Sequence, residues 1–149
     1  MNKFFQRMFQ SIFSRGYKQR LINISEILGL GIDFDDSDTD ESVEEKFITR
    51  TASACGCTLQ WRPDFDDFLE NFREFATAEE IELVDAIPAR TWTSNQEFVT
   101  VIKQRMLDIG NERMPILLES LGDFCHFLLV PKDKSASLER EAGGWLIET

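Results

Sequence analysis

The sequence predicts an α+β fold, in which a small antiparallel sheet, mainly C-terminal, carries amphipathic helices packed on one face. Helical periodicity dominates the first 110 residues, and two apolar stretches between residues 115 and 130 have the pattern of a β-hairpin. The chain has 149 residues, 42% of them hydrophobic, which suits one domain with its own core. Helices followed by strands are typical of the α+β class.

The first 30 residues are expected to form two helical stretches. Gly16 is predicted to end the first, and the second is predicted to run from Leu21 to a stop at Gly29. Residues 1–20 carry five bases and no acid, so the chain divides into a basic amphipathic arm, 1–20, and a single acidic domain, 21–149. The apolar face of the arm is expected to comprise Phe5, Met8, Phe9, Ile12 and Phe13.

A dense acidic run occupies residues 33–45, and its end has the signals of a helix start. Asp40 is the expected N-cap, and Gly56 is the expected end of this helix. Residues 57–61 then alternate apolar and polar side chains, which predicts a half-buried strand. The inner face of the helix is expected to comprise Val43, Phe47, Ile48 and Ala54.

The most regular apolar stripe follows Asp64, which is the expected start of another helix. Opposite the stripe lie polar residues such as Asp67 and Glu70. Each large side chain that is fully buried contributes about 1.5 to 3 kcal/mol, so the stripe is expected to anchor the core. Its members are Phe65, Phe68, Leu69, Phe72, Phe75 and Ala76.

Two capping boxes predict two more helices. Thr77 and Glu80 have the spacing in which each side chain bonds the backbone of the other, at the start of a short helix. Ser94 and Glu97 repeat that spacing before a longer amphipathic helix, which Gly110 is expected to end.

The C-terminal third reads as strands. Residues 115–120 and 124–130 are apolar and are joined by a short segment with a central glycine, which predicts a β-hairpin. The second stretch is apolar on both faces, so it is expected at the centre of the sheet. Residues 132–141 are predicted to form at least one helical turn, and residues 145–147 a last edge strand.

Composition restricts the partners and the compartment. The chain has 27 acids against 16 bases, a net charge of −11. Nucleic-acid binding relies on cationic side chains that neutralise phosphates, so a nucleic-acid partner is not expected. The three cysteines cannot complete a disulfide set, and no apolar run suits a signal peptide or a spanning helix, so the expected location is cytoplasmic.

The basic arm, residues 1–20, has two alternative uses. A helix with cations and an apolar face can lie on an anionic membrane. The same face can instead pack on the core of the domain. Packing is favoured because most amphipathic helices in small domains contribute to the core.

The spacing within the acidic run partly matches an EF-hand calcium loop. Asp38 stands where that loop needs a glycine for its sharp turn, and Asp40 where it needs an apolar residue. A solvated or partner-facing loop is therefore favoured, and calcium binding is kept as an alternative. The six ligand positions are occupied by Asp33, Asp35, Ser37, Thr39, Glu41 and Glu44.

Cys55, Cys57, Cys125 and His126 are the residues that would serve a zinc site or a thiol-dependent enzyme. One residue separates Cys55 from Cys57, fewer than structural zinc sites use, and Cys125 and His126 on one strand would point to opposite faces. Buried thiols and a hydrogen-bonded histidine in the sheet are favoured, and an enzyme using Cys55 or Cys57 with His126 is an alternative. Because common catalytic and nucleotide motifs are absent from the sequence, no catalytic residue, metal ligand or cofactor is predicted.

Two segments resemble a bacterial family of uncharacterised proteins, domain of unknown function 6630. The first comprises residues 59–61, Leu-Gln-Trp, and residues 64–69, Asp-Phe-Asp-Asp-Phe-Leu. The second is the late apolar hairpin, residues 117–131. The two segments lie within residues 59–131, about half of the chain. The resemblance implies an α+β fold and carries no known activity.

These observations predict a non-catalytic interaction protein whose acidic surface binds a cationic protein. The most concrete version is a bacterial immunity protein that neutralises a basic toxin such as a nuclease, its carboxylates standing in for phosphates. The predicted partner-binding residues are Asp33, Asp35, Asp36, Asp38, Asp40, Glu41, Glu44 and Glu45.

Overall fold

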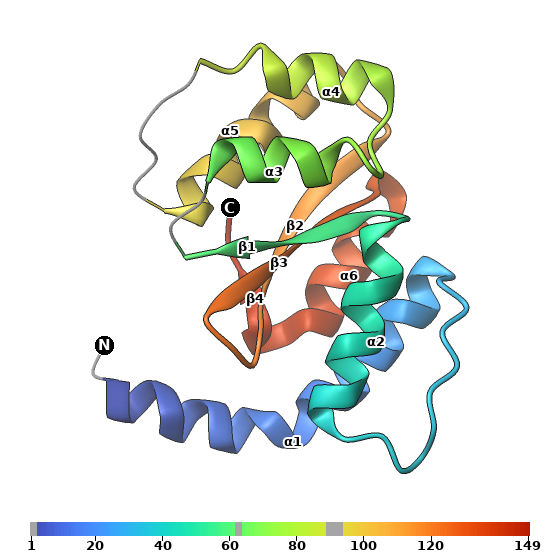
Figure 1. Ribbon diagram of the computed structural model, residues 1–149, viewed down its shortest axis with the longest axis vertical. Helices are drawn as coiled ribbons and strands as arrows, with labels where there is room; N and C mark the ends of the chain where they lie inside the picture. The colour runs from blue at the N-terminus through green and yellow to red at the C-terminus, as the bar shows by residue number, and fades with distance from the viewer. Residues whose placement is uncertain (1–2, 62–63, 89–93) are drawn as a thin grey trace.

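The computed structural model describes residues 3–61, 64–88 and 94–149, with side chains from residue 16 onward. Helices and strands alternate irregularly along the chain, and three of the four strands follow residue 112 (Figure 1). The elements are α1 (Lys3–Leu28), α2 (Asp40–Ala52), β1 (Gly56–Gln60), α3 (Phe65–Phe72), α4 (Ala78–Asp85), α5 (Asn95–Asp108), β2 (Arg113–Glu119), β3 (Phe124–Pro131), η1 (Lys132–Lys134), α6 (Ser135–Ala142), η2 (Gly143–Trp145) and β4 (Leu146–Ile147).

The four strands form one antiparallel sheet in the order β1-β3-β2-β4. The hairpin of β2 and β3 pairs Leu117 with Phe127, and β1 adds on the other side of β3, pairing Leu59 with Cys125. The α+β class, the hairpin, the central place of the second hairpin strand and the edge position of the last strand are all confirmed.

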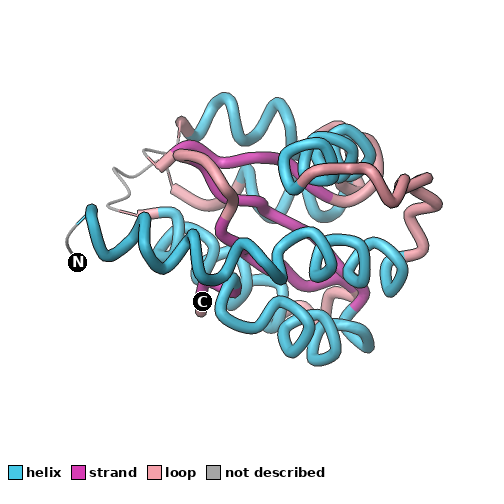
Figure 2. The backbone as a smooth tube through the Cα atoms, turned by 90° about the horizontal axis from the view of Figure 1, so that it is seen from below, coloured by secondary structure: helices cyan, strands magenta, loops and turns pink. Residues whose placement is uncertain are grey.

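Helices cover both faces of the sheet, so the predicted packing on one face alone is wrong. In Figure 1, α3, α4 and α5 lie above the strands, and α1 and α2 lie below them. In Figure 2, which views the molecule from below, α1 crosses in front of the strands. The physical reason lies in β3, where residues 125–130 are all buried, because a strand that is apolar on both faces needs cover on both.

Two apolar clusters fill the two sides. On one side, Phe127 of β3 packs against Phe68 and Phe72 of α3, with ring centroids 5.1 and 6.1 Å apart. On the other side, Leu128 and neighbouring residues of the sheet meet α1, α2 and α6. The stripe predicted after Asp64 is therefore a core stripe, although its helix ends at Phe72.

Helix α1 is continuous, and the predicted break at Gly16 is wrong. One glycine inside a helix costs only about 1 kcal/mol, whereas Tyr17, Leu21 and Ile24 are each at most 2% exposed in the core. The predicted basic arm, residues 1–20, therefore enters the domain within one helix. Its predicted apolar face, Phe5 to Phe13, lies outside the side chains that the structure describes.

The helix after the acidic run begins one residue earlier than predicted and ends sooner. Thr39, and not Asp40, is the N-cap, because its side chain accepts a hydrogen bond from the N–H of Ser42. Helix α2 ends at Ala52, and Gly56 begins β1. Val43 and Phe47 face inward as predicted, whereas Ile48 is half-buried and Ala54 is exposed. The capping box of Thr77 and Glu80 is confirmed.

Candidate functional site

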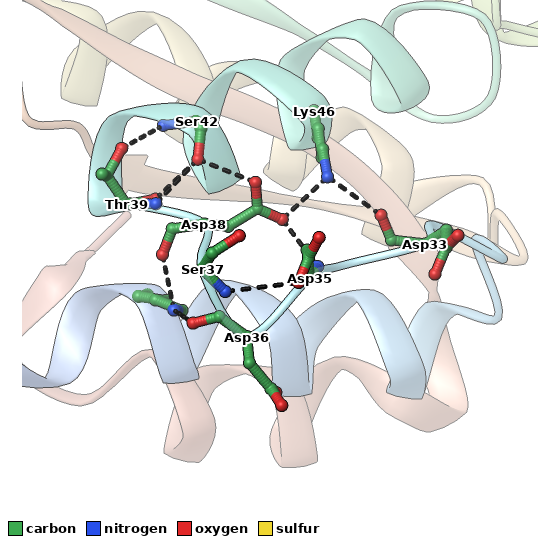
Figure 3. Close-up of polar contacts among 9 residues, drawn as sticks. Asp33, Asp35, Asp36, Ser37, Asp38, Thr39, Ser42 and Lys46 are labelled. Atoms are coloured by element: carbon green, nitrogen blue, oxygen red, sulfur yellow. Dashed lines mark hydrogen bonds and ion pairs between the residues drawn. The ribbon is translucent and has the colours of Figure 1, made fainter.

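Asp38 organises the acidic loop that precedes α2 (Figure 3). Its Oδ2 atom accepts a hydrogen bond from the N–H of Asp35 at 2.8 Å, and its Oδ1 atom accepts one from the hydroxyl of Ser42 at 3.0 Å. The N–H of Thr39 donates to the same hydroxyl at 2.8 Å. Short polar side chains that bond nearby backbone are typical of tight turns and N-caps, so the sequence of this run shapes its own loop.

Two lysines from the neighbouring helices α1 and α2 hold the loop. Lys46 of α2 donates to Oδ2 of Asp38 at 2.7 Å and to the carbonyl of Asp33 at 3.1 Å. Lys18 of α1 donates to the carbonyls of Asp38, at 2.5 Å, and Asp36, at 3.3 Å. The hydrogen bond from Lys46 is the largest cause that lowers the pKa of Asp38 to about 2. The loop is thus held by cations from two helices of its own chain.

The donors that matched a calcium loop are not gathered around a common point. Glu44, which would be the bidentate ligand, is turned into the interior, where its carboxylate bonds Tyr17 and His126. Within residues 3–61, 64–88 and 94–149, no group of three or more His, Cys, Asp or Glu side chains is placed to hold a metal ion. The same finding leaves Cys55, Cys57, Cys125 and His126 without the geometry of a zinc site.

The predicted partner-binding residues divide by exposure. Asp38 and Asp40 are half-buried, and burial together with Glu41 raises the pKa of Asp40. Glu44 is 7% exposed, so its inclusion in a surface patch is wrong. The residues that remain exposed on the loop and the first turns of α2 are Asp33, Asp35, Asp36, Glu41 and Glu45, which we call the loop patch.

Glu44 belongs instead to a buried polar cluster with Tyr17 and His126. The hydroxyl of Tyr17 donates to Oε2 of Glu44, and Nε2 of His126 lies 3.2 Å from the same oxygen and 3.1 Å from the hydroxyl. The N–H of Leu121, in the turn between β2 and β3, donates to that oxygen at 3.2 Å. The cluster therefore joins α1, α2 and the hairpin.

The proton positions in this cluster follow from the geometry. Tyr17 has one hydroxyl proton, which it gives to Glu44, so Nε2 of His126 must carry a proton to bond either partner. Burial opposes the charged form of Glu44, but hydrogen bonds from His126 and Tyr17 outweigh it and lower the pKa of Glu44. Burial and the nearby carboxylate raise the pKa of Tyr17. The expectation of a hydrogen-bonded histidine in the sheet is confirmed.

The thiols lack the features of a catalytic nucleophile. Burial raises the pKa of Cys55 to about 11, of Cys57 to about 12 and of Cys125 to about 11. Cys57 and Cys125 pack in the cluster on the α3 side of the sheet, whereas His126 faces α1 and α2. Cys55 lies in the cluster on the His126 side, but the imidazole there bonds Glu44 and Tyr17. A thiolate nucleophile needs a depressed pKa and a base within hydrogen-bond reach, so the geometry does not support the thiol-dependent enzyme.

A second acidic surface lies on α3 and α4, outside the residues predicted to bind the partner. Arg73 is the one base among residues 64–85, and it pairs with Asp85. Glu80 is 2% exposed and pairs with Arg113 of β2, so it is structural. The exposed carboxylates here are Asp64, Asp66, Asp67, Glu70, Glu74, Glu79, Glu82 and Asp85.

None of the family models, curated proteins or solved structures compared with the chain matches it. The resemblance to domain of unknown function 6630 therefore stays a prediction. Among the described helices, none combines the length and the apolar character that crossing a bilayer requires.

Proposed function

We propose that this chain is a non-catalytic interaction domain that binds a cationic protein in the cytoplasm. In its most concrete form it is a bacterial immunity protein that blocks a basic toxin such as a nuclease. Carboxylates of the loop patch, Asp33, Asp35, Asp36, Glu41 and Glu45, would occupy the positions that nucleic-acid phosphates take on such a toxin.

The observation that carries this proposal is the way the loop keeps its carboxylates available. Lys18 and Lys46 donate their hydrogen bonds to backbone carbonyls and to the carboxylate of Asp38. Among the described residues, the ion pairs found involve none of the five loop-patch carboxylates. The loop is therefore held by lysines of α1 and α2, while the loop-patch carboxylates make no direct ion pair among the described residues. A preorganised charged surface loses less entropy on binding than a mobile one.

Charge also accounts for selectivity and speed in this proposal. A domain with a net charge of −11 repels acidic proteins and attracts basic ones over about one Debye length, roughly 8 Å at physiological ionic strength. Complementary potentials raise association rates and exclude wrong partners more than they raise final affinity. An inhibitor that must reach a toxin before the toxin acts gains most from a fast association.

The test compares two variants of equal charge change, using as the partner a basic protein that co-purifies with the unmodified chain from cells that express it naturally. The first carries Asp35→Asn, Asp36→Asn, Glu41→Gln and Glu45→Gln. The control carries Glu79→Gln, Glu82→Gln, Glu112→Gln and Asp133→Asn, four exposed positions elsewhere.

The first variant is expected to slow association by about tenfold at low salt, and the control to slow it much less. Association of the unmodified protein should also slow as ionic strength rises. Equal effects of the two variants, or rates indifferent to salt, would remove the loop patch as the binding surface.

A further inference from the structure

Strand β1 forms an open edge of the sheet. It pairs with β3 on one side, and the order β1-β3-β2-β4 leaves its other side without a strand among the described residues. Its five residues, Gly56–Gln60, include no charged residue and no proline. Edge strands usually carry such residues because they prevent another chain from pairing.

The hydrogen-bond phase of β1 shows which backbone groups face outward. The N–H of Leu129 in β3 donates to the carbonyl of Cys55 at 2.6 Å, whereas the N–H of Cys55 donates to the carbonyl of Thr51. The bond from Leu129 places Cys55 at a hydrogen-bonded position of the ladder. Such positions alternate along an antiparallel ladder, so Cys57 and Leu59 turn their backbone groups toward β3. The intervening residues turn theirs away from the sheet.

Part of this outer edge is already occupied. The carbonyl of Gln60 accepts a hydrogen bond from Nδ2 of Asn95 at 2.8 Å. This bond agrees with a carbonyl that points away from β3. Gly56 is buried next to the end of α2. The groups that remain are the N–H and carbonyl of Thr58 and the N–H of Gln60. Among the described residues they have no hydrogen-bond partner outside β1.

The helix that packs against β1 is acidic on its exposed side, and one large aromatic side chain follows the strand. Helix α3 contacts β1 and lies along it in Figure 1. It exposes Asp66, Asp67 and Glu70, and Glu74 follows just beyond its end. Trp61 directly follows the strand and is 52% exposed. A tryptophan ring binds cations through its face, and carboxylates attract them.

We propose that β1 accepts an extended, lysine- or arginine-rich segment of the partner as an added strand. The backbone groups of Thr58 and Gln60 would pair with that strand. Side chains alternate between the two faces of a strand, so the cationic side chains at every second position would face α3 and Trp61. This inference rests on the proposed function, because it names how the cationic partner is bound. A second copy of this chain is disfavoured as the occupant, because each copy carries a charge of −11.

The loop patch and the edge of β1 can serve the same partner. Helix α2 lies between them in the chain, and its 13 residues alone span about 20 Å at 1.5 Å per residue, with Thr58 and Gln60 farther along β1. A small protein covers such a distance within one interface of standard size. The loop patch would attract the partner, and the edge of β1 would fix its register.

The test uses a short peptide of alternating lysine and threonine with blocked ends, titrated into the full chain. Binding is expected to slow amide hydrogen exchange at Thr58 and Gln60. Thr58→Pro removes the outward N–H, which an edge strand tolerates, and is expected to weaken binding by about tenfold. Thr58→Val keeps that N–H and is expected to bind as the unmodified protein does.

Three further measurements complete the test. The same peptide with N-methyl groups on alternate residues cannot pair with an edge, so it should bind the unmodified protein about tenfold more weakly, whether or not Thr58→Pro folds. The double variant Asp66→Asn, Glu70→Gln should bind the lysine peptide more weakly than the unmodified protein does. A glutamate–threonine peptide should bind far more weakly than the lysine peptide.

The outcomes separate this inference from the proposed function. If the lysine peptide leaves the Thr58 amide unprotected and N-methylation leaves its affinity unchanged, strand addition is wrong. The proposed function stands in that case, provided that the loop-patch variant still slows association with the basic partner. A different result is that the lysine and glutamate peptides bind alike and that the loop-patch variant associates with the basic partner as fast as the unmodified protein does. In that case strand addition and the proposed function are both wrong.

Discussion

The carboxylate of Glu44 and the imidazole of His126 lie 3.2 Å apart in the interior, although 82 positions separate them in the chain. Tyr17 bonds the same carboxylate oxygen from α1. Three elements distant in sequence are thus joined by one oxygen atom. A polar cluster of this kind stabilises a fold only while every member keeps its partners.

Replacing Glu44 with Gln is expected to destabilise the domain by roughly 1 to 3 kcal/mol. The amide keeps the shape of the side chain, but it loses the charged acceptor that the hydroxyl of Tyr17 and Nε2 of His126 share. Glu45→Gln is the matched control, because Glu45 is exposed on the same helix. Denaturant unfolding measures both, and similar stabilities of the two variants would contradict the role of the cluster.

Protonation of Glu80 in acid is expected to lower the stability of the domain. Burial favours the neutral form of this side chain, but hydrogen bonds from Arg113, Thr77 and Asn111 outweigh it and lower the pKa of Glu80 to about 2, from an ordinary 4.5. A group whose pKa is lower in the folded state contributes stability above its unfolded pKa. That contribution is lost as the pH falls from about 4.5 to about 2.

The measurement is the free energy of unfolding as a function of pH. In Glu80→Gln the loss of stability between pH 4.5 and 2 is expected to be smaller than in the unmodified protein. Glu79→Gln, at an exposed neighbouring position, should keep the full pH dependence. An unchanged slope in Glu80→Gln would show that other carboxyl groups dominate acid unfolding.

Local signals in the sequence predicted the elements well. The capping box of Thr77 and Glu80 and the N-cap Ser94 operate within one helical turn, so their spacing is visible in the chain. The hairpin of β2 and β3 was predicted for the same reason, because its turn and its apolar strands are neighbours. The break at Gly16 failed because packing of Tyr17 against distant elements outweighs a small local penalty.

The candidate site was predicted less completely because its contacts are long-range. The exposure of Asp35, Asp36 and Glu41 followed from their charge, but the inward turn of Glu44 depends on Tyr17 and His126. One signal was available, since Glu44 shares a helix face with Phe47 and Thr51, three and seven positions later. The open edge of β1 could not be predicted, because strand order is a property of the whole sheet.

Two glycine substitutions should change the stability of the domain in opposite directions. A Cβ atom at Gly56 would lie 2.5 Å from the carbonyl oxygen of Phe127 and 2.8 Å from a methyl carbon of Leu128, so Gly56→Ala is expected to cost about 1 to 3 kcal/mol. At Gly16 the nearest atom to a new Cβ is Nε of Arg20 at 3.6 Å. Gly16→Ala is therefore expected to stabilise α1 by about 0.5 to 1 kcal/mol.

Thermal unfolding of the two variants and of the unmodified protein shows whether each substitution stabilises or destabilises the domain as expected. A melting temperature lowered by Gly16→Ala would indicate that α1 needs the glycine for a reason other than helix propensity. A Gly56→Ala variant as stable as the unmodified protein would show that β1 can move away from β3 without cost.

Removing Lys46 should release the acidic loop while leaving the fold intact. Without this ammonium group, Asp38 loses the hydrogen bond that most lowers its pKa, so Lys46→Met is expected to raise the pKa of Asp38 from about 2 toward its ordinary 3.8. The carbonyl of Asp33 loses its donor as well. Carboxyl chemical shifts recorded against pH report the change directly. Lys103→Met, on α5, is the control and should leave Asp38 unaffected, and an unshifted Asp38 in Lys46→Met would mean that the loop is held by its own backbone and side-chain hydrogen bonds.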